Sequence, residues 1–78
     1  MNTLEWKSKE TWPEMNYADV GKVTYYAVKL KSGHHECCLI TRHRRRLDLA
    51  VYKETMEEVK RICEQHYVSR VGFRRVAA

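Results

Sequence analysis

Five consecutive residues in the middle of the chain carry the densest charge in the sequence: Arg42, His43, Arg44, Arg45 and Arg46. Guanidinium groups form paired hydrogen bonds with phosphates and carboxylates, so this run could contact nucleic acid or an acidic groove on a protein. A solvated, charge-rich turn is the plainer interpretation. Because four arginines in five residues exceed what solubility requires, we predict that this run binds a partner.

A second basic block lies at the C-terminal end. Residues 22–47 carry seven bases against one acid, and residues 69–78 add three arginines, whereas residues 1–21 and 48–68 each have a net charge of −2. If the two basic blocks meet in space, they form one cationic face. The candidate partner-binding residues in the second block are Arg70, Arg74 and Arg75.

Cysteine and histidine side chains suggest a metal site at first: His34, His35, Cys37, Cys38, Cys63 and His66. Their spacing is poor, because no Cys-x-x-Cys or His-x-x-x-His pair occurs and consecutive strand residues point to opposite faces. A cysteine nucleophile would also need an oriented base and a loop that stabilises an oxyanion, and neither has a sequence signature here. We therefore expect no metal, no cofactor and no enzyme activity.

The residues before and around the arginine run predict β-structure. Residues 22–31 and 36–42 are rich in β-branched and aromatic side chains and flank the turn at Ser32 and Gly33, which predicts an antiparallel hairpin. Alternating apolar residues after the run predict a third strand, so residues 22–52 form a hairpin or a meander. The arginine run would then lie in the connection that follows the second strand.

The best-supported element is a helix over residues 53–67. Thr55 and Glu58 have the spacing of a capping box, and apolar residues recur three and four positions apart from Met56 to Tyr67. Val71 and Phe73 alternate with other residues, which predicts a closing strand over residues 69–76. Residues 1–21 are interpreted as an N-terminal arm whose Trp6 and Trp12 cover an edge of the core.

These elements predict one small α+β domain over residues 1–78, with ββ(β)αβ order. An antiparallel sheet of three to four strands carries one amphipathic helix on one face. The other face stays open to a partner. Alternation puts Tyr26, Val28 and Leu30 on one face and Tyr25, Ala27 and Lys29 on the other, and we place the second set on the open face. An unpaired edge strand would also allow a homodimer.

Length and composition limit the function. Seventy-eight residues build a core too small to enclose a deep active site as well. No stretch approaches the roughly 20 apolar residues that span a bilayer, the first residues lack the apolar core of a signal peptide, and three cysteines suit free thiols in a reducing compartment. We therefore expect a cytoplasmic protein that does not contact membranes.

Two segments near the C-terminus resemble a known family. The residues Tyr52-Lys53-Glu54-Thr55-Met56-Glu57-Glu58-Val59, then Cys63 to Val68 and Gly72-Phe73-Arg74-Arg75-Val76, resemble the second half of T7-type phage inhibitors of bacterial RNA polymerase. Size and pattern are also similar to those of other phage host-takeover factors, including anti-CRISPR proteins. The resemblance implies a non-enzymatic inhibitor and carries a contact role to Arg74 and Arg75 on a final strand. The arginine run and the longer N-terminus depart from the family's pattern.

The sequence therefore predicts a non-catalytic inhibitor, present in the host cytoplasm if it is phage-encoded. Its basic surface would block a host protein or ribonucleoprotein complex that handles nucleic acid. The alternative is a module that binds DNA or RNA directly, through the same arginines and without sequence preference.

Overall fold

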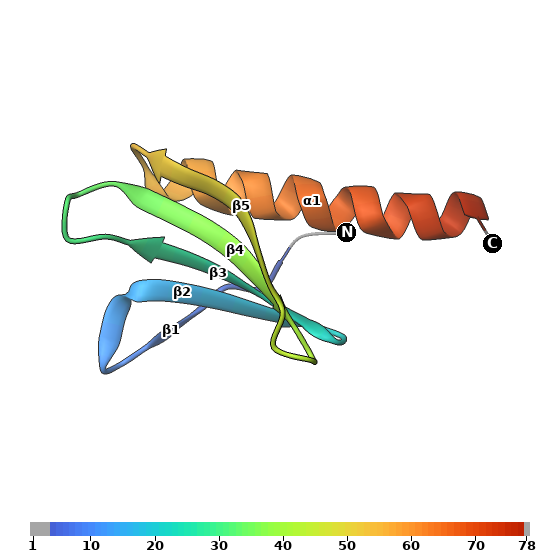
Figure 1. Ribbon diagram of the computed structural model, residues 1–78, viewed down its shortest axis with the longest axis horizontal. Helices are drawn as coiled ribbons and strands as arrows, with labels where there is room; N and C mark the ends of the chain where they lie inside the picture. Colours follow the sequence, from blue (N-terminus) through green and yellow to red (C-terminus); the bar gives the residue numbers. More distant parts are fainter. Residues whose placement is uncertain (1–3, 78) are drawn as a thin grey trace.

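The computed structural model describes the backbone of residues 4–77 and the side chains of residues 4–70. Five strands form one antiparallel sheet in the order β1-β2-β3-β4-β5, and a helix follows the last strand (Figure 1). The elements are β1 (Lys7–Lys9), β2 (Trp12–Val20), β3 (Val23–Lys29), β4 (His35–Thr41), β5 (Arg46–Lys53) and α1 (Met56–Ala77).

The sheet is a meander because every connection between strands is short. Gly21 and Gly33 take positive φ angles, 62° and 92°, in the turns before β3 and β4, where a residue without a Cβ meets no steric cost. The α+β class, the hairpin and the third strand of the meander are confirmed. The expected count of three to four strands is wrong, since the N-terminal arm itself contributes β1 and β2.

Pro13 did not prevent β2 from joining the sheet. The ladder between β2 and β3 runs from Met15 to Val20, so Pro13 lies before its first pair, and in the ladder with β1 it falls in the irregular stretch between the pairs of Trp12 and Asn16. A missing N–H costs nothing at that position, which is why a proline is tolerated there.

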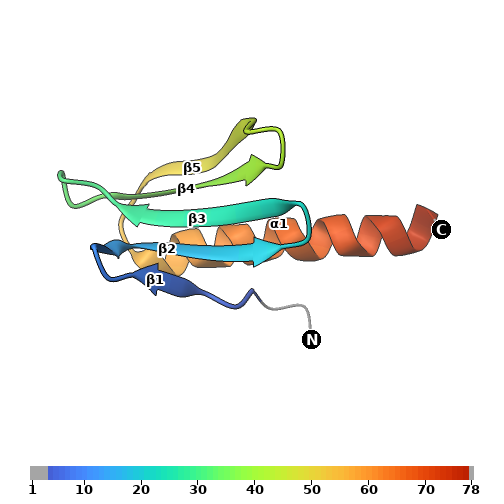
Figure 2. The same ribbon diagram turned by 90° about the horizontal axis from the view of Figure 1, so that it is seen from below.

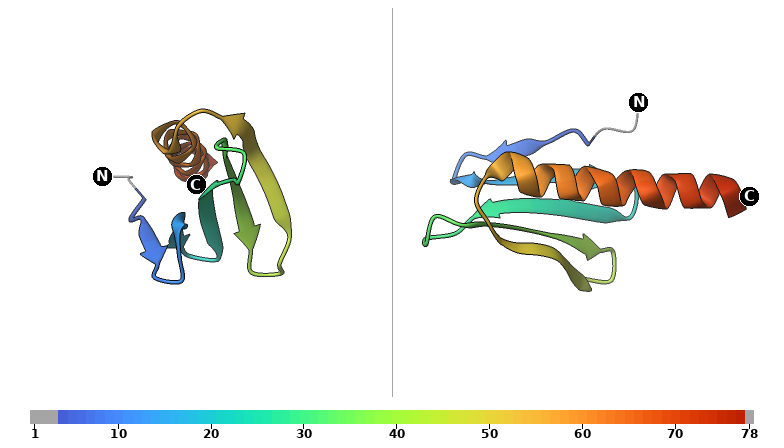
Figure 3. Two further views of the ribbon diagram at one scale, coloured as in Figure 1. Left: turned by 90° about the vertical axis from the view of Figure 1, so that its left-hand side faces the viewer. Right: turned by 90° about the horizontal axis from the view of Figure 1, so that it is seen from above.

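The helix α1 covers one face of the sheet (Figure 3). Thr55 caps it as the spacing predicts, because its Oγ1 accepts a hydrogen bond of 3.1 Å from the backbone N–H of Glu58. Glu57 and Glu58 occupy the first turn, where the helix dipole favours negative charge.

The predicted strand over residues 69–76 is wrong, and with it the ββ(β)αβ order, because α1 continues to Ala77. No glycine or proline stops the helix before Gly72, and each added residue gains a backbone hydrogen bond without a new nucleation step. A single glycine inside a helix costs only about 1 kcal/mol, less than starting a new element.

The core lies between α1 and the face of β3 and β4 that carries small side chains. Ala27 and Cys37 let the helix approach closely, and Val59 and Cys63 fill the space from the helix side. Tyr25 is fully buried there as well. The prediction that Tyr25 lies on the open face is therefore wrong: the helix covers the face on which Ala27 and Cys37 leave room for it, and leaves Tyr26 and Val28 on the other.

The helix is longer than the sheet it covers. At 1.5 Å per residue its 22 residues span about 33 Å, whereas the seven residues of β3 or β4 span about 23 Å. It begins at the end of the sheet where β5 finishes, and its C-terminal part extends past the opposite end (Figures 1 and 2). The β4–β5 loop and the β2–β3 turn both lie at that opposite end.

Candidate partner-binding site

The arginine run forms the tip of the hairpin between β4 and β5. The N–H of Thr41 donates to the carbonyl of Arg45 at 2.9 Å, which closes a loop over residues 42–44. Arg44 has a φ of 61°, the left-handed conformation that the third residue of such loops adopts and that glycine usually supplies. Arg42, Arg44 and Arg45 are exposed, and no carboxylate of the described residues pairs with them.

Lys22 lies beside this tip. It belongs to the exposed β2–β3 turn, and a shallow hollow of about 430 Å³ lies between that turn and the end of β4. Lys22 and Arg42 both line the hollow, together with Tyr26 and Ile40. Sequence reasoning did not single out Lys22, since its neighbourhood with Arg42 depends on the register between β3 and β4. We call Lys22, Arg42, Arg44 and Arg45 the basic end.

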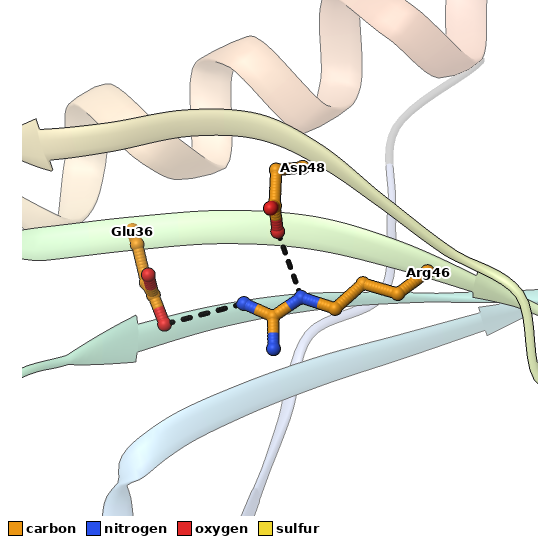
Figure 4. Close-up of polar contacts among 3 residues, drawn as sticks. All are labelled: Glu36, Arg46 and Asp48. Carbon is orange, nitrogen blue, oxygen red and sulfur yellow. Dashed lines mark hydrogen bonds and ion pairs between the residues drawn. The ribbon is translucent and has the colours of Figure 1, made fainter.

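Arg46 differs from the other arginines of the run. Its Nε donates to Oδ1 of Asp48 at 2.7 Å, and its guanidinium lies 3.5 Å from Oε1 of Glu36 (Figure 4). The hydrogen bond to Asp48 raises the pKa of Arg46, and the nearby acidic groups add to the shift. Arg46 therefore neutralises carboxylates of its own sheet and is not a free cation for a partner.

Arg70 comes from α1 and lies near the start of β3. It is half-buried, and its positive charge acts to lower the pKa of both Tyr25 and His66. The hydroxyl of Tyr25 hydrogen-bonds Nδ1 of His66 at 2.8 Å. Burial raises the pKa of Tyr25, and burial together with Arg70 lowers the pKa of His66. This cluster joins the helix to the sheet beside the basic end.

The structure does not place the remaining predicted residues at the basic end. Lys29 is exposed but ends β3 at the opposite end of the sheet. Arg74 and Arg75 belong to the part of α1 whose side chains lie outside the described residues, and their backbone is helical. The structure thus groups Arg42, Arg44 and Arg45 with Lys22. Lys29 lies at the other end of β3, Tyr25 is buried under the helix, and Arg46 is engaged by Asp48 and Glu36.

The cysteines are free thiols on both faces of the sheet. Cys37 lies under the helix against Cys63, and Cys38 lies on the opposite face. A hydrogen bond to Cys37 and burial raise the pKa of Cys63, and burial raises that of Cys38, so both thiols hold their protons at neutral pH. Among residues 4–70, no three side chains of the metal-binding types gather around one point.

The face that the helix leaves uncovered is apolar. Met15 and Cys38 are only 6% and 7% exposed although no helix lies over them, because Trp12, Tyr26 and the stem of Arg46 surround them. The side chains leave a groove of about 270 Å³. It is lined by Trp12, Met15, Tyr26, Val28, Leu30, Glu36, Cys37, Cys38, Ile40 and Arg46.

Comparison of the chain with models of protein families, with curated proteins and with solved structures finds no match. No helix within the described part of the chain has the length and apolar character needed to cross a membrane.

Proposed function

We propose that this chain is a non-catalytic, phage-type inhibitor that binds a nucleic-acid-handling protein complex of a bacterial host and blocks it by covering part of its surface. The basic end is the part that docks. The observation that carries the proposal is the hairpin tip, where Arg42, Arg44 and Arg45 extend into solvent without partners among the described residues. Because these guanidinium groups have no partner within residues 4–70, all their hydrogen-bond donors are available to carboxylates on an acidic surface.

The backbone of the tip supports the same proposal. Arg44 occupies a left-handed conformation that costs a residue with a Cβ about 1–2 kcal/mol. Strained residues of this kind cluster at functional sites, where the surrounding structure holds them in place.

An acidic protein surface suits the molecule better than nucleic acid does. The open face beside the basic end is apolar, and its charged groups include Glu36, Asp48 and Asp19. Asp19 accepts a hydrogen bond of 2.6 Å from Thr24 close to the β2–β3 turn. Arg46 offsets one of these charges, and the net negative charge that remains would repel phosphates lying across the sheet. A protein partner needs acidic groups only where it meets the basic end and can place apolar side chains on the rest of the face, and an apolar centre with a charged rim is the usual composition of a protein interface.

The test is capture from a bacterial lysate with the tagged protein, before and after nuclease treatment. Two variants are compared with the native chain. Arg44→Glu with Arg45→Glu reverses charge at the tip, and Lys7→Glu with Lys9→Glu makes the same total change on β1, at exposed positions. Each should leave the free energy of unfolding within about 0.5 kcal/mol of the native value.

The native chain and the β1 variant should retain the same host complex after nuclease treatment, and the tip variant should retain at least about tenfold less, because reversed charges now face acidic groups of the partner. Equal retention by the tip variant would refute the docking role of the basic end. Release of the captured protein by nuclease would favour direct binding of nucleic acid instead.

A further inference from the structure

We propose that the open face binds a segment of the protein partner in which large apolar side chains stand next to carboxylates. The apolar side chains enter the groove of the open face, and the carboxylates lie over Lys22 and Arg42. This inference rests on the proposed function and names the chemistry that the partner must present.

The groove has the size of a site for side chains. Its volume of about 270 Å³ is below the roughly 300–1,000 Å³ of pockets that hold whole small molecules. It suits one or two bulky apolar side chains, which commonly supply most of the energy of a protein interface when they fill a pocket. Trp12, which is 47% exposed, forms one wall and would lose solvent contact when the groove is filled.

The groove continues into the basic hollow. Tyr26 and Ile40 line both, so the two form one strip along the open face, from the end of the sheet where β2 begins and β3 finishes to the basic end. Lys22 and Arg42 lie at the hollow and not at the groove. A segment bound along the strip therefore contacts apolar surface in the groove and the two cations at the hollow.

The charges at the groove fix the orientation of the segment. Arg46 is the cation at the groove, and it is held by Asp48 at 2.7 Å and by Glu36 at 3.5 Å. These three groups leave an excess of one negative charge, so carboxylates of a partner are disfavoured there. They are favoured over the hollow, where Lys22 and Arg42 outnumber the nearby Asp19, whose carboxylate accepts a hydrogen bond from Thr24, and where the described residues provide no ion pair for either cation.

A second copy of this chain fits the strip less well. Each copy has a formal net charge of +5 and would bring the same cations to the interface. Pairing through β5 is also disfavoured, because the register with β4 shifts twice along the strand and Tyr52 has a φ of 58°. Such irregularities bend an edge strand away from further pairing.

The test is selection from a library of random twelve-residue peptides displayed on phage, with the immobilised full-length chain as bait. Ile40→Glu places a charge in the strip, and Lys22→Glu with Arg42→Glu reverses the hollow. Lys29→Glu is the control, since this exposed residue lies at the end of β3 away from the hollow and does not line the groove. The peptide most enriched by the native chain is then synthesised with a fluorescent label, and its affinity for each variant is measured by anisotropy.

The native chain and Lys29→Glu should enrich peptides that combine aromatic or large aliphatic residues with neighbouring Asp or Glu. Ile40→Glu and the hollow variant should each bind the synthetic peptide at least about tenfold more weakly, and only the contribution of the hollow should weaken with salt. Because Ile40→Glu could disturb the sheet, Val28→Thr provides a second test: it adds a hydroxyl to the groove at nearly constant volume and should weaken binding severalfold.

Three results would overturn the inference. They are enrichment of basic peptides or of peptides with no shared composition, equal affinity of all variants for the selected peptide, and a native dimer in sedimentation that Ile40→Glu dissociates. The last result would show that a second copy fills the groove. The inference fails alone if lysate capture depends on the tip arginines but no acidic, apolar peptides are enriched. The proposed function fails alone if such peptides are enriched but capture ignores the tip.

Discussion

Arg44 has a left-handed backbone conformation in which its Cβ causes a steric cost. Its φ of 61° closes the β4–β5 loop, and glycine would adopt this angle without the steric cost. The sequence predicted a charged connection at this place but not this angle, because nothing in a run of arginines indicates which residue turns left-handed. The register of β4 with β5 decides it, and that register is a property of the whole sheet.

Replacing Arg44 by glycine should therefore stabilise the protein while it weakens binding. Relief of about 1–2 kcal/mol outweighs the roughly 0.5–1 kcal/mol by which the flexibility of glycine stabilises the unfolded chain, so the free energy of unfolding should rise by up to about 1.5 kcal/mol. Chemical denaturation measures it. Arg45→Gly is the matched control: its φ is not positive, and it should lose about 0.5–1 kcal/mol. A loss of stability in Arg44→Gly would show that the loop carries no strain.

His66 gives the protein a pH dependence with a definite sign. Burial and Arg70 lower its pKa in the fold, so in the window from its ordinary value of about 6.5 down to the folded pKa, the unfolded chain binds more protons. Stability should fall as the pH decreases through this window and should then level off. His66→Gln should show a shallower decrease when urea midpoints are compared at several pH values between 7.5 and 5. An equal slope in the variant would assign the dependence to other groups.

The secondary-structure elements show where sequence patterns sufficed and where they did not. The hairpin from β3 to β4, the strand β5 and the Thr55 cap were predicted from alternation, a turn glycine and helix spacing, all of which are local signals. The length of α1 was not, because Val71 and Phe73 alternate like a strand although no residue stops the helix before Gly72. The prediction of which face of the sheet the helix covers was also wrong, because both sides of β3 carry aromatic and aliphatic residues. The packing of Ala27 and Cys37 against the helix determines which face is covered.

The capping contact of α1 can be tested directly. Thr55→Ala removes the hydroxyl oxygen that accepts from the Glu58 N–H at 3.1 Å, so the free energy of unfolding should decrease by about 1 kcal/mol. Thr55→Ser keeps the oxygen and should retain most of the stability. If alanine and serine were equivalent in thermal or chemical unfolding, the hydrogen bond would contribute nothing to the start of the helix.

At the scale of the whole molecule, the proposed function depends on which groups share an end of the sheet. The β4–β5 loop and the β2–β3 turn meet there because a meander alternates its connections between two ends (Figure 2). The sequence predicted the arginines of the tip, but it could not place Lys22 beside Arg42 or show that Arg46 is neutralised by Glu36 and Asp48. Those relations follow from strand register and from side chains brought together across the sheet.

Hydrogen–deuterium exchange, read by mass spectrometry on the free chain and on the complex recovered from lysate, tests the docking surface most directly. If the basic end docks, exchange should slow in the peptides that contain residues 42–45 and 21–22, which are exposed in the free chain, and should stay unchanged at residues 10–11 and 31–33 in the opposite turns. Slowing confined to those opposite turns, with residues 42–45 exchanging as in the free chain, would contradict the account.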